Sequence, residues 1–340
     1  MSTKSVKWTK LICILIISVV ASSAPPVIAS EVSELGDKAM TACKNRDYDT
    51  AITYWDKLIE LGDTDAYLGR GLTYYQKNDY EKAITDLDKT IRLKPIPYAF
   101  EMRGDVYSRE NNHAKAVDDY SESIKLDPKN GGVYLSRAEQ NLFQNYFDAA
   151  LIDCNTAIMI LSDTSGTNDL LVQAYVTRGI ALERKNEHAR AFDDYDKVIR
   201  LDTNNAAAYN GRGLMFFWKG EYANAISDCK EAIRLAPKQS SPYDRLAWIL
   251  AVCPDAKYRD GQKSLEISKK ACEMTAWKDP VCLTTLAAAY AEIGNYQEAE
   301  KIVEKCLGMG IPPDFEKEIQ QQLDLYKQKK PYRVEPLPAK

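Results

Sequence analysis

The sequence is poor in histidine, a residue that catalysis and metal binding often use. It contains two histidines, His113 and His188, and no second histidine stands near either one to complete a nucleophile or metal site. It has no Cys-x-x-Cys pair, which argues against a zinc or redox centre, and it has no glycine-rich phosphate loop. These absences predict a protein that is not an enzyme and needs no cofactor, metal or small-molecule substrate. An enzyme or enzyme accessory remains an alternative.

An excess of positive charge is lacking, and so is a long hydrophobic run. The formal net charge is −4, so nucleic acid is not an expected partner. The apolar run at residues 11–21 is short for a membrane span, but three lysines precede it, and Val27 and Ala29 stand at the −3 and −1 places of a cleavage site. This pattern predicts a bacterial signal peptide at residues 1–29 and a periplasmic or secreted protein. An uncleaved signal anchor is the alternative, and it would be the protein's link to a membrane.

What the sequence does contain is a repeat. Six segments carry a small residue about twelve positions before a second one, and the second small residues are 32, 33, 34, 41 and 34 positions apart. The pairs are Ala39/Ala51, Gly71/Ala83, Gly104/Ala116, Ala138/Ala150, Gly179/Ala191 and Gly213/Ala225, with two further units at Ala247/Ser264 and Ala287/Ala299. Small residues at matched places allow two helices to pack closely, so each unit is expected to be a helical hairpin.

These units resemble tetratricopeptide repeats. Gly71, Tyr74, Ala83 and Pro95 match the pattern of that family in one unit, and the same pattern returns in several others. The resemblance implies an all-α fold, a right-handed α-solenoid of about eight hairpins over residues 30–310. A stripe of Phe315, Ile319, Leu323 and Tyr326 predicts a C-terminal capping helix at residues 311–328. A mobile proline-rich tail is expected at residues 329–340.

A second pattern links arginine and aspartate. Five middle units carry an arginine just before the first small residue and an aspartate three places after the second, and the other units lack both. The arginines could form an anion-binding row, or the pairs could form a structural ladder that joins stacked helices. We favour the ladder, because arginine prefers bidentate carboxylate partners and is costly to bury without one. Its members are Arg70, Arg103, Arg137, Arg178, Arg212, Asp86, Asp119, Asp153, Asp194 and Asp228.

The stretch "GLMFFWKG" at residues 213–220 carries the main hint of function. In the repeat register Phe216 takes a packed aromatic place, whereas Phe217 and Trp218 fall at positions 12 and 13, which line the concave groove in this family. We therefore expect Phe216 to be buried and Phe217 and Trp218 to be partly exposed, unless a tight superhelix, or the extra loop residues at 162–171 and 253–261, cover them. The groove residues predicted from this register are Tyr75, Arg109, Leu142, Phe143, Arg184, Asn210, Leu214, Phe217, Trp218 and Trp248.

Clustered exposed aromatic side chains usually mark a binding surface. We therefore predict a non-enzymatic interaction scaffold of the cell envelope that binds a peptide or protein segment, of unknown identity, in its groove. The alternative is a structural subunit of an envelope complex that docks through its ends or its convex face. Some family members bind the C-terminal carboxylate of a partner with an asparagine at position 9 of the repeat. No unit of this sequence has asparagine there, so this carboxylate clamp is not expected.

The cysteines offer one further prediction. Cys13 lies in the predicted signal peptide, which leaves seven cysteines in the mature chain. An odd number leaves at least one free thiol in a monomer. Cys272 and Cys282 end and begin consecutive helices, and they are the most plausible disulfide in an oxidising compartment.

Overall fold

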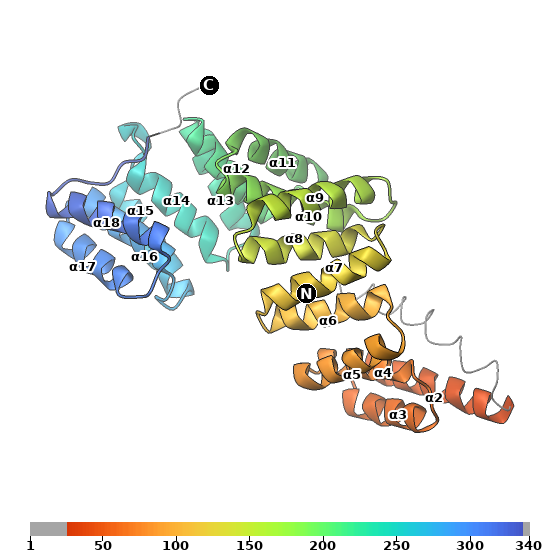
Figure 1. The fold of residues 1–340 in the computed structure, drawn as a ribbon. Helices are drawn as coiled ribbons and strands as arrows, with labels where there is room; N and C mark the ends of the chain where they lie inside the picture. The colour runs from red at the N-terminus through yellow and green to blue at the C-terminus, as the bar shows by residue number, and fades with distance from the viewer. Residues whose placement is uncertain (1–25, 336–340) are drawn as a thin grey trace. The chain divides into compact units, whose positions relative to one another are not determined.

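The computed structural model describes residues 26–335, and the predicted signal peptide lies largely outside this range. Every described element is a helix, and no strand occurs between residues 26 and 335, which confirms the all-α class (Figure 1). The described chain forms two compact units, residues 26–164 and 165–335. No helix in this part of the chain is both long and apolar enough to cross a membrane.

The first unit contains four helical hairpins. Their helices are α2 (Pro26–Lys44) with α3 (Tyr48–Glu60), α4 (Ala66–Gln76) with α5 (Tyr80–Leu93), α6 (Pro97–Arg109) with α7 (His113–Leu126), and α8 (Gly131–Phe143) with α9 (Phe147–Ser162). Helix α2 begins at Pro26, so the last residues of the predicted signal peptide are helical.

The second unit contains four more hairpins and a final helix. They are α10 (Asn168–Arg184) with α11 (His188–Leu201), α12 (Ala206–Trp218) with α13 (Tyr222–Leu235), α14 (Ser240–Val252) with α15 (Gly261–Met274), and α16 (Pro280–Glu292) with α17 (Tyr296–Leu307), followed by α18 (Pro313–Lys327). The helices thus follow the repeat boundaries that the small residues predict.

Most hairpin turns share one backbone device, a single residue in the left-handed region. It is Asn78 (φ 64°), Asn111 (φ 59°), Asn145 (φ 60°) and Asn186 (φ 59°) in four hairpins, and Gly220 (φ 76°) in another. Asparagine and glycine tolerate this conformation best, which explains why these residue types follow the first helix in these five hairpins; Arg46 (φ 62°) takes the place in the first hairpin.

The small residues do allow close helix packing. A Cβ atom added to Gly104 would lie 2.8 Å from the ring of Tyr120, and one added to Gly179 would lie 2.8 Å from the ring of Tyr195. Both tyrosine rings are fully buried between the helices of their hairpins. Any larger residue at either glycine would displace a core ring.

The hairpin of α14 and α15 has a longer turn, which contains the short 3-10 helix η2 (Ala256–Tyr258). Its contact residue on α15 is Ser264, whose hydroxyl donates to the carbonyl of Ala247 at 2.7 Å. Tyr258 folds back onto Tyr222, with 5.6 Å between the ring centroids. The longer turn therefore covers part of the preceding hairpin.

Helix α18 covers the end of the second unit with Ile319, Leu323 and Tyr326, which are buried, while Phe315 packs at the margin of the same cluster. The chain does not become free after this helix. Of the tail predicted to be mobile at residues 329–340, residues 331–335 lie against α14 and α16, because Arg333 bonds to the Glu292 side chain and the Ala251 carbonyl, and Val334 bonds to the Val252 carbonyl. Residues 336–340 lie outside the described residues.

Candidate partner-binding surface

The five arginine–aspartate pairs are present as bidentate ion pairs. In each, the guanidinium Nε and Nη2 atoms donate to the two oxygens of the aspartate sixteen residues later, at distances such as 2.8 and 2.6 Å for Arg103 and Asp119. The same geometry joins Arg70 to Asp86, Arg137 to Asp153, Arg178 to Asp194 and Arg212 to Asp228. Each pair joins the two helices of one hairpin, and its aspartate is buried.

Several of these arginines also reach the preceding hairpin. Arg70 donates to Asp56 and Arg103 to Asp88, both at 2.5 Å, Arg212 to Asp196 at 2.9 Å, and Arg137 to the hydroxyl of Ser121 at 2.9 Å. Each arginine also lies over an aromatic ring three residues earlier, 5.3–5.8 Å from its centroid. The guanidinium groups are committed to protein carboxylates, which is the geometry of a structural ladder rather than of an anion-binding row.

The apolar run on α12 does not face the way the repeat register suggests. Phe217 is fully buried, whereas Phe216 and Trp218 are half-buried. Phe216 lies beside the arginine ladder, with its ring edge on Phe192 at 5.1 Å and the Arg212 guanidinium 5.5 Å away. The prediction was therefore wrong for Phe216, which is not fully buried, and for Phe217, which is not a groove residue.

The burial of Phe217 has an identifiable cause. Its ring contacts Trp248 of α14 at 4.7 Å, Trp218 at 5.5 Å and Tyr222 at 5.4 Å, centroid to centroid. Tyr222 is in turn covered by Tyr258 from the long turn after α14. Trp248 of the next hairpin and Tyr222 of the same hairpin thus cover Phe217, whereas Trp218 and Trp248 remain partly exposed.

Trp218 is held on its other side by His188 of α11, whose ring stacks on the indole at 5.4 Å. Burial lowers the pKa of His188, with Glu183 opposing the shift, so the neutral ring is favoured. His113 in the first unit occupies the same place in its repeat and stacks on Phe143 at 4.8 Å. Both histidines are packing residues at the hairpin turns.

Some of the remaining predicted groove residues belong to the first unit and others to the second. In the first, Arg109 is exposed and donates to the Tyr75 hydroxyl at 3.4 Å, Leu142 is half-buried, and Phe143 is 68% exposed. In the second, Arg184 is exposed and Leu214 is half-buried.

Asn210 is nearly buried, and its side-chain amide is already used within the second unit. It donates to Ser241 at 3.0 Å and accepts from Arg245 at 3.1 Å. Asn210 therefore joins α12 to α14 and offers no free group to a partner.

The predicted disulfide is absent. Cys272 and Cys282 are free and buried, and their sulfur atoms have different partners. The Cys272 thiol donates to the Cys282 carbonyl at 3.3 Å, and the Cys282 thiol approaches Asp279 at 3.6 Å. Burial raises the pKa of Cys272 to about 12, so the reactive thiolate is strongly disfavoured.

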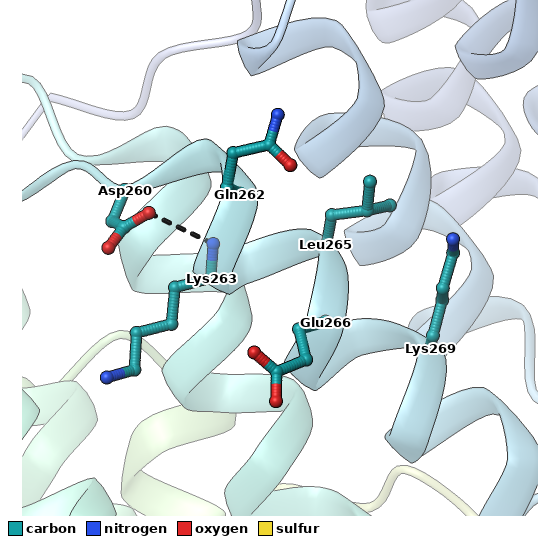
Figure 2. Close-up of a pocket in the computed structure, with 6 residues that line it drawn as sticks. All are labelled: Asp260, Gln262, Lys263, Leu265, Glu266 and Lys269. Carbon is teal, nitrogen blue, oxygen red and sulfur yellow. Dashed lines mark hydrogen bonds between the residues drawn. The ribbon is translucent and has the colours of Figure 1, made fainter.

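A shallow surface pocket lies along α15, and it does not form a convincing site. Asp260, Gln262, Lys263, Leu265, Glu266 and Lys269 line it, all from one helix and its N-cap residue. Figure 2 shows that these side chains point in different directions rather than toward a common centre. Among residues 26–335, no group of histidine, cysteine, aspartate and glutamate side chains is arranged to hold a metal ion.

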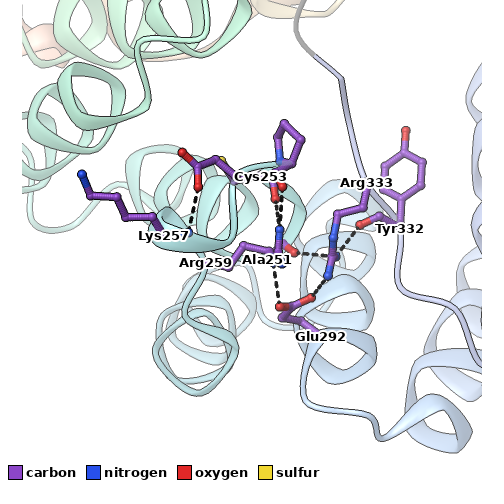
Figure 3. A network of polar contacts seen from close by, with 9 residues as sticks. Ala251, Cys253, Lys257, Arg259, Glu292, Tyr332 and Arg333 are labelled. Carbon is purple, nitrogen blue, oxygen red and sulfur yellow. Dashed lines mark hydrogen bonds and ion pairs between the residues drawn. The ribbon is translucent and has the colours of Figure 1, made fainter.

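Sequence reasoning missed one polar network in the second unit. Glu292 accepts from Arg259 at 3.0 Å and from Arg333 of the C-terminal segment (Figure 3). An arginine and a tyrosine within an otherwise proline-rich tail were the available signal, since neither residue is needed in a mobile linker.

Comparison with known proteins agrees with this architecture. Tetratricopeptide repeat models match residues 64–96 and 206–239, residues 98–130 and 172–205, and residues 281–309. A tetratricopeptide repeat protein from Parabacteroides merdae is similar in structure, with a TM-score of 0.56 and 16% identity over 78% of this chain and 98% of that one.

The C-terminal part of a repeat-containing protein from Cytophaga hutchinsonii has a TM-score of 0.53 and 18% identity, over 73% of this chain and 98% of that one. No curated protein sequence matches the chain. At these identities the two structures bear on the fold alone. The chain therefore carries tetratricopeptide repeats, and its fold is that of the α-solenoids built from them.

Proposed function

We propose that the protein is a non-enzymatic scaffold that binds a peptide or protein segment on the surface formed by Trp218 and Trp248. The proposal is carried by one observation, the way in which the rest of the protein holds these two rings in place. Both are partly exposed, and both rest on Phe217, which is fully buried. Large rings held in place by a packed core offer contact area at little entropic cost on binding.

The architecture supports a binding role over catalysis. Tetratricopeptide repeats generally present the first helix of each hairpin to a protein partner, and Trp218 and Trp248 lie on two successive first helices, α12 and α14. The histidines and the strongest ion pairs are used in packing, as described above. We place this activity in the cell envelope, on the basis of the signal peptide predicted for residues 1–29.

The test is a binding comparison between two tryptophan variants. Once a partner has been captured from the periplasm and identified, Trp218→Ala should weaken its binding by about 2 kcal/mol or more, or roughly thirtyfold. Trp277→Ala is the matched control, because Trp277 is 41% exposed but lies in the turn between α15 and α16. Equal binding by wild type and Trp218→Ala would contradict the proposal that this surface binds the partner.

A second function, docking as a structural subunit, is favoured by one observation. Ile152 and Met159 on α9 are 66% and 63% exposed, and seven residues place them on the same helical face. Under this alternative Ile152→Asp would abolish assembly and Trp218→Ala would not. The same binding assay therefore separates the two functions.

A further inference from the structure

The C-terminal segment, residues 331–335, follows α18 without forming a helix or strand and lies across the ends of α14 and α16. The Val334 amide donates to the carbonyl of Val252 at 3.2 Å, and Arg333 Nη1 donates to the carbonyl of Ala251 at 3.2 Å. Tyr332 and Val334 pack against the apolar cluster that contains Phe217 and Trp248. The segment thus contacts the end of α14 through its main chain and, through its side chains, the apolar cluster on which the partner-binding surface rests.

The surface beneath Arg333 consists of acceptors. Helix α14 ends at Val252, so the carbonyls of its last turn have no partner within the helix, and the negative end of the helix dipole lies there. Glu292 adds a carboxylate whose side chain is only 14% exposed. Figure 3 shows Arg259 and Arg333 beside this carboxylate, and each arginine donates to one of its two oxygens. Such a site selects a guanidinium group.

Arg259 fixes the site in place. Its Nη1 atom donates to the carbonyls of Cys253 and Pro254, both at 2.8 Å, and its Nε atom holds Glu292 at 3.0 Å. Glu292 and the end of α14 are therefore positioned by contacts that do not involve the C-terminal segment. The acceptor site would persist if that segment left.

The repeat register shows what the segment covers. Ala251 and Val252 are the counterparts in the α14 hairpin of Phe217 and Trp218, and Glu292 is the counterpart of Trp218 in the next hairpin. The position of Trp218, unlike that of the buried Phe217, is the one at which a first helix is expected to meet a partner. The segment therefore occupies the same kind of surface that the proposed function assigns to a ligand.

We propose that residues 331–335 fill, in cis, a site for an extended segment that carries an arginine between apolar residues. The proposal rests on the proposed function, which it deepens by naming the partner's chemistry: an extended peptide of the type aromatic–arginine–apolar. The chain's own segment is then an internal competitor that the partner must displace. A tethered segment competes at an effective concentration in about the millimolar range, so a weak contact is enough to block free peptide.

The test uses the chain's own sequence as the probe. A fluorescent peptide of residues 331–340 is titrated into the full chain and into a chain that ends at Lys330, and anisotropy is measured. The shortened chain should bind the peptide at least about tenfold more tightly than the full chain does. A peptide with Arg333→Ala should bind the shortened chain at least about tenfold more weakly than the native peptide, because it loses the charge-assisted hydrogen bonds.

Circular dichroism shows whether the shortened chain is folded. If it is folded and binds neither peptide, or binds both equally, the proposal is wrong and the segment is a fixed structural strap. If it does not fold, the full chain with Arg333→Ala replaces it. That variant should bind the native peptide at least about tenfold more tightly than wild type does, and unchanged binding would again overturn the proposal.

The outcome is distinguishable from that of the proposed function. The peptide experiment needs no identified partner and reports on Glu292 and the end of α14, whereas the Trp218→Ala experiment reports on the aromatic surface. A failed peptide experiment leaves the tryptophan result standing, and a null result for Trp218→Ala leaves the peptide result standing.

Discussion

The ring of Phe217 lies 4.7 Å from the ring of Trp248, yet the first side chain is fully buried and the second is partly exposed. Phe217→Ala should therefore act as a core deletion and lower the free energy of unfolding by about 3–5 kcal/mol. Trp218→Ala removes a ring that still touches solvent, so its cost should be clearly smaller. Denaturant unfolding of the two variants, with slopes compared to check two-state behaviour, measures both values.

Phe216→Ala provides the control for this comparison. Phe216 is half-buried beside the arginine ladder, so its truncation should cost less than that of Phe217 although it removes the same atoms from the neighbouring position. A larger loss of stability in Phe216→Ala than in Phe217→Ala would contradict the core position assigned to Phe217.

The contrast between Phe216 and Phe217 separates what the sequence predicts from what it does not. Small residues at fixed spacing are set by helix–helix contact within one hairpin, and they predicted the hairpins of both units. The exposure of Phe217 depends instead on aromatic side chains brought by α14 and by the long turn that follows it. The spacing of residues within one hairpin carries no information about contacts that a later hairpin makes. The place of residues 331–335 was hidden for the same reason, since Arg333 meets Ala251 across 82 positions of sequence.

The arginine ladder can be tested with two adjacent aspartates. Asp119 is buried and accepts two hydrogen bonds from Arg103, whereas Asp118 is exposed. Asp119→Ala leaves a partly buried guanidinium without its main partner and should lower stability by about 3 kcal/mol or more. Asp118→Ala should change stability by less than about 0.5 kcal/mol. Thermal unfolding of the pair is sufficient, and similar losses in both variants would contradict a structural role for the ladder.

The thiols should differ sharply in reactivity. Among the described cysteines, only Cys43 is partly exposed, and the other six are buried. Brief treatment of the native protein with iodoacetamide, followed by peptide mass spectrometry, should label Cys43 ahead of all others. The reaction should be slow even there, because burial raises the pKa of the Cys43 thiol. Unfolded protein, in which every thiol reacts, is the control. Early labelling of Cys229, whose sulfur lies in the core of the α12–α13 hairpin, would count against this packing.

Asp244 on α14 should make the stability of the protein depend on pH. Its Oδ1 atom is buried and has no hydrogen-bond partner. Burial raises the pKa of this carboxyl group to about 6, Thr285 and Arg245 oppose the shift, and the nearby Asp279 adds to it. The folded-state pKa is therefore above that of the unfolded chain, which loses its proton first as the pH rises. Ionisation of Asp244 consequently favours unfolding.

The expected result is a loss of stability between about pH 4 and pH 6 of up to about 3 kcal/mol, taking 1.36 kcal/mol for each unit of pKa difference. The side-chain amide in the Asp244→Asn variant cannot ionise. The free energy of unfolding of this variant should therefore rise relative to that of the wild type across this interval and remain higher at pH 7. Unfolding in urea at several pH values measures the difference between the two proteins, which cancels the titration of all other carboxylates. Asp193→Asn, at an exposed position on α11, is the control. A constant difference between Asp244→Asn and wild type from pH 4 to pH 7 would mean that Asp244 ionises in the folded protein as easily as in the unfolded chain.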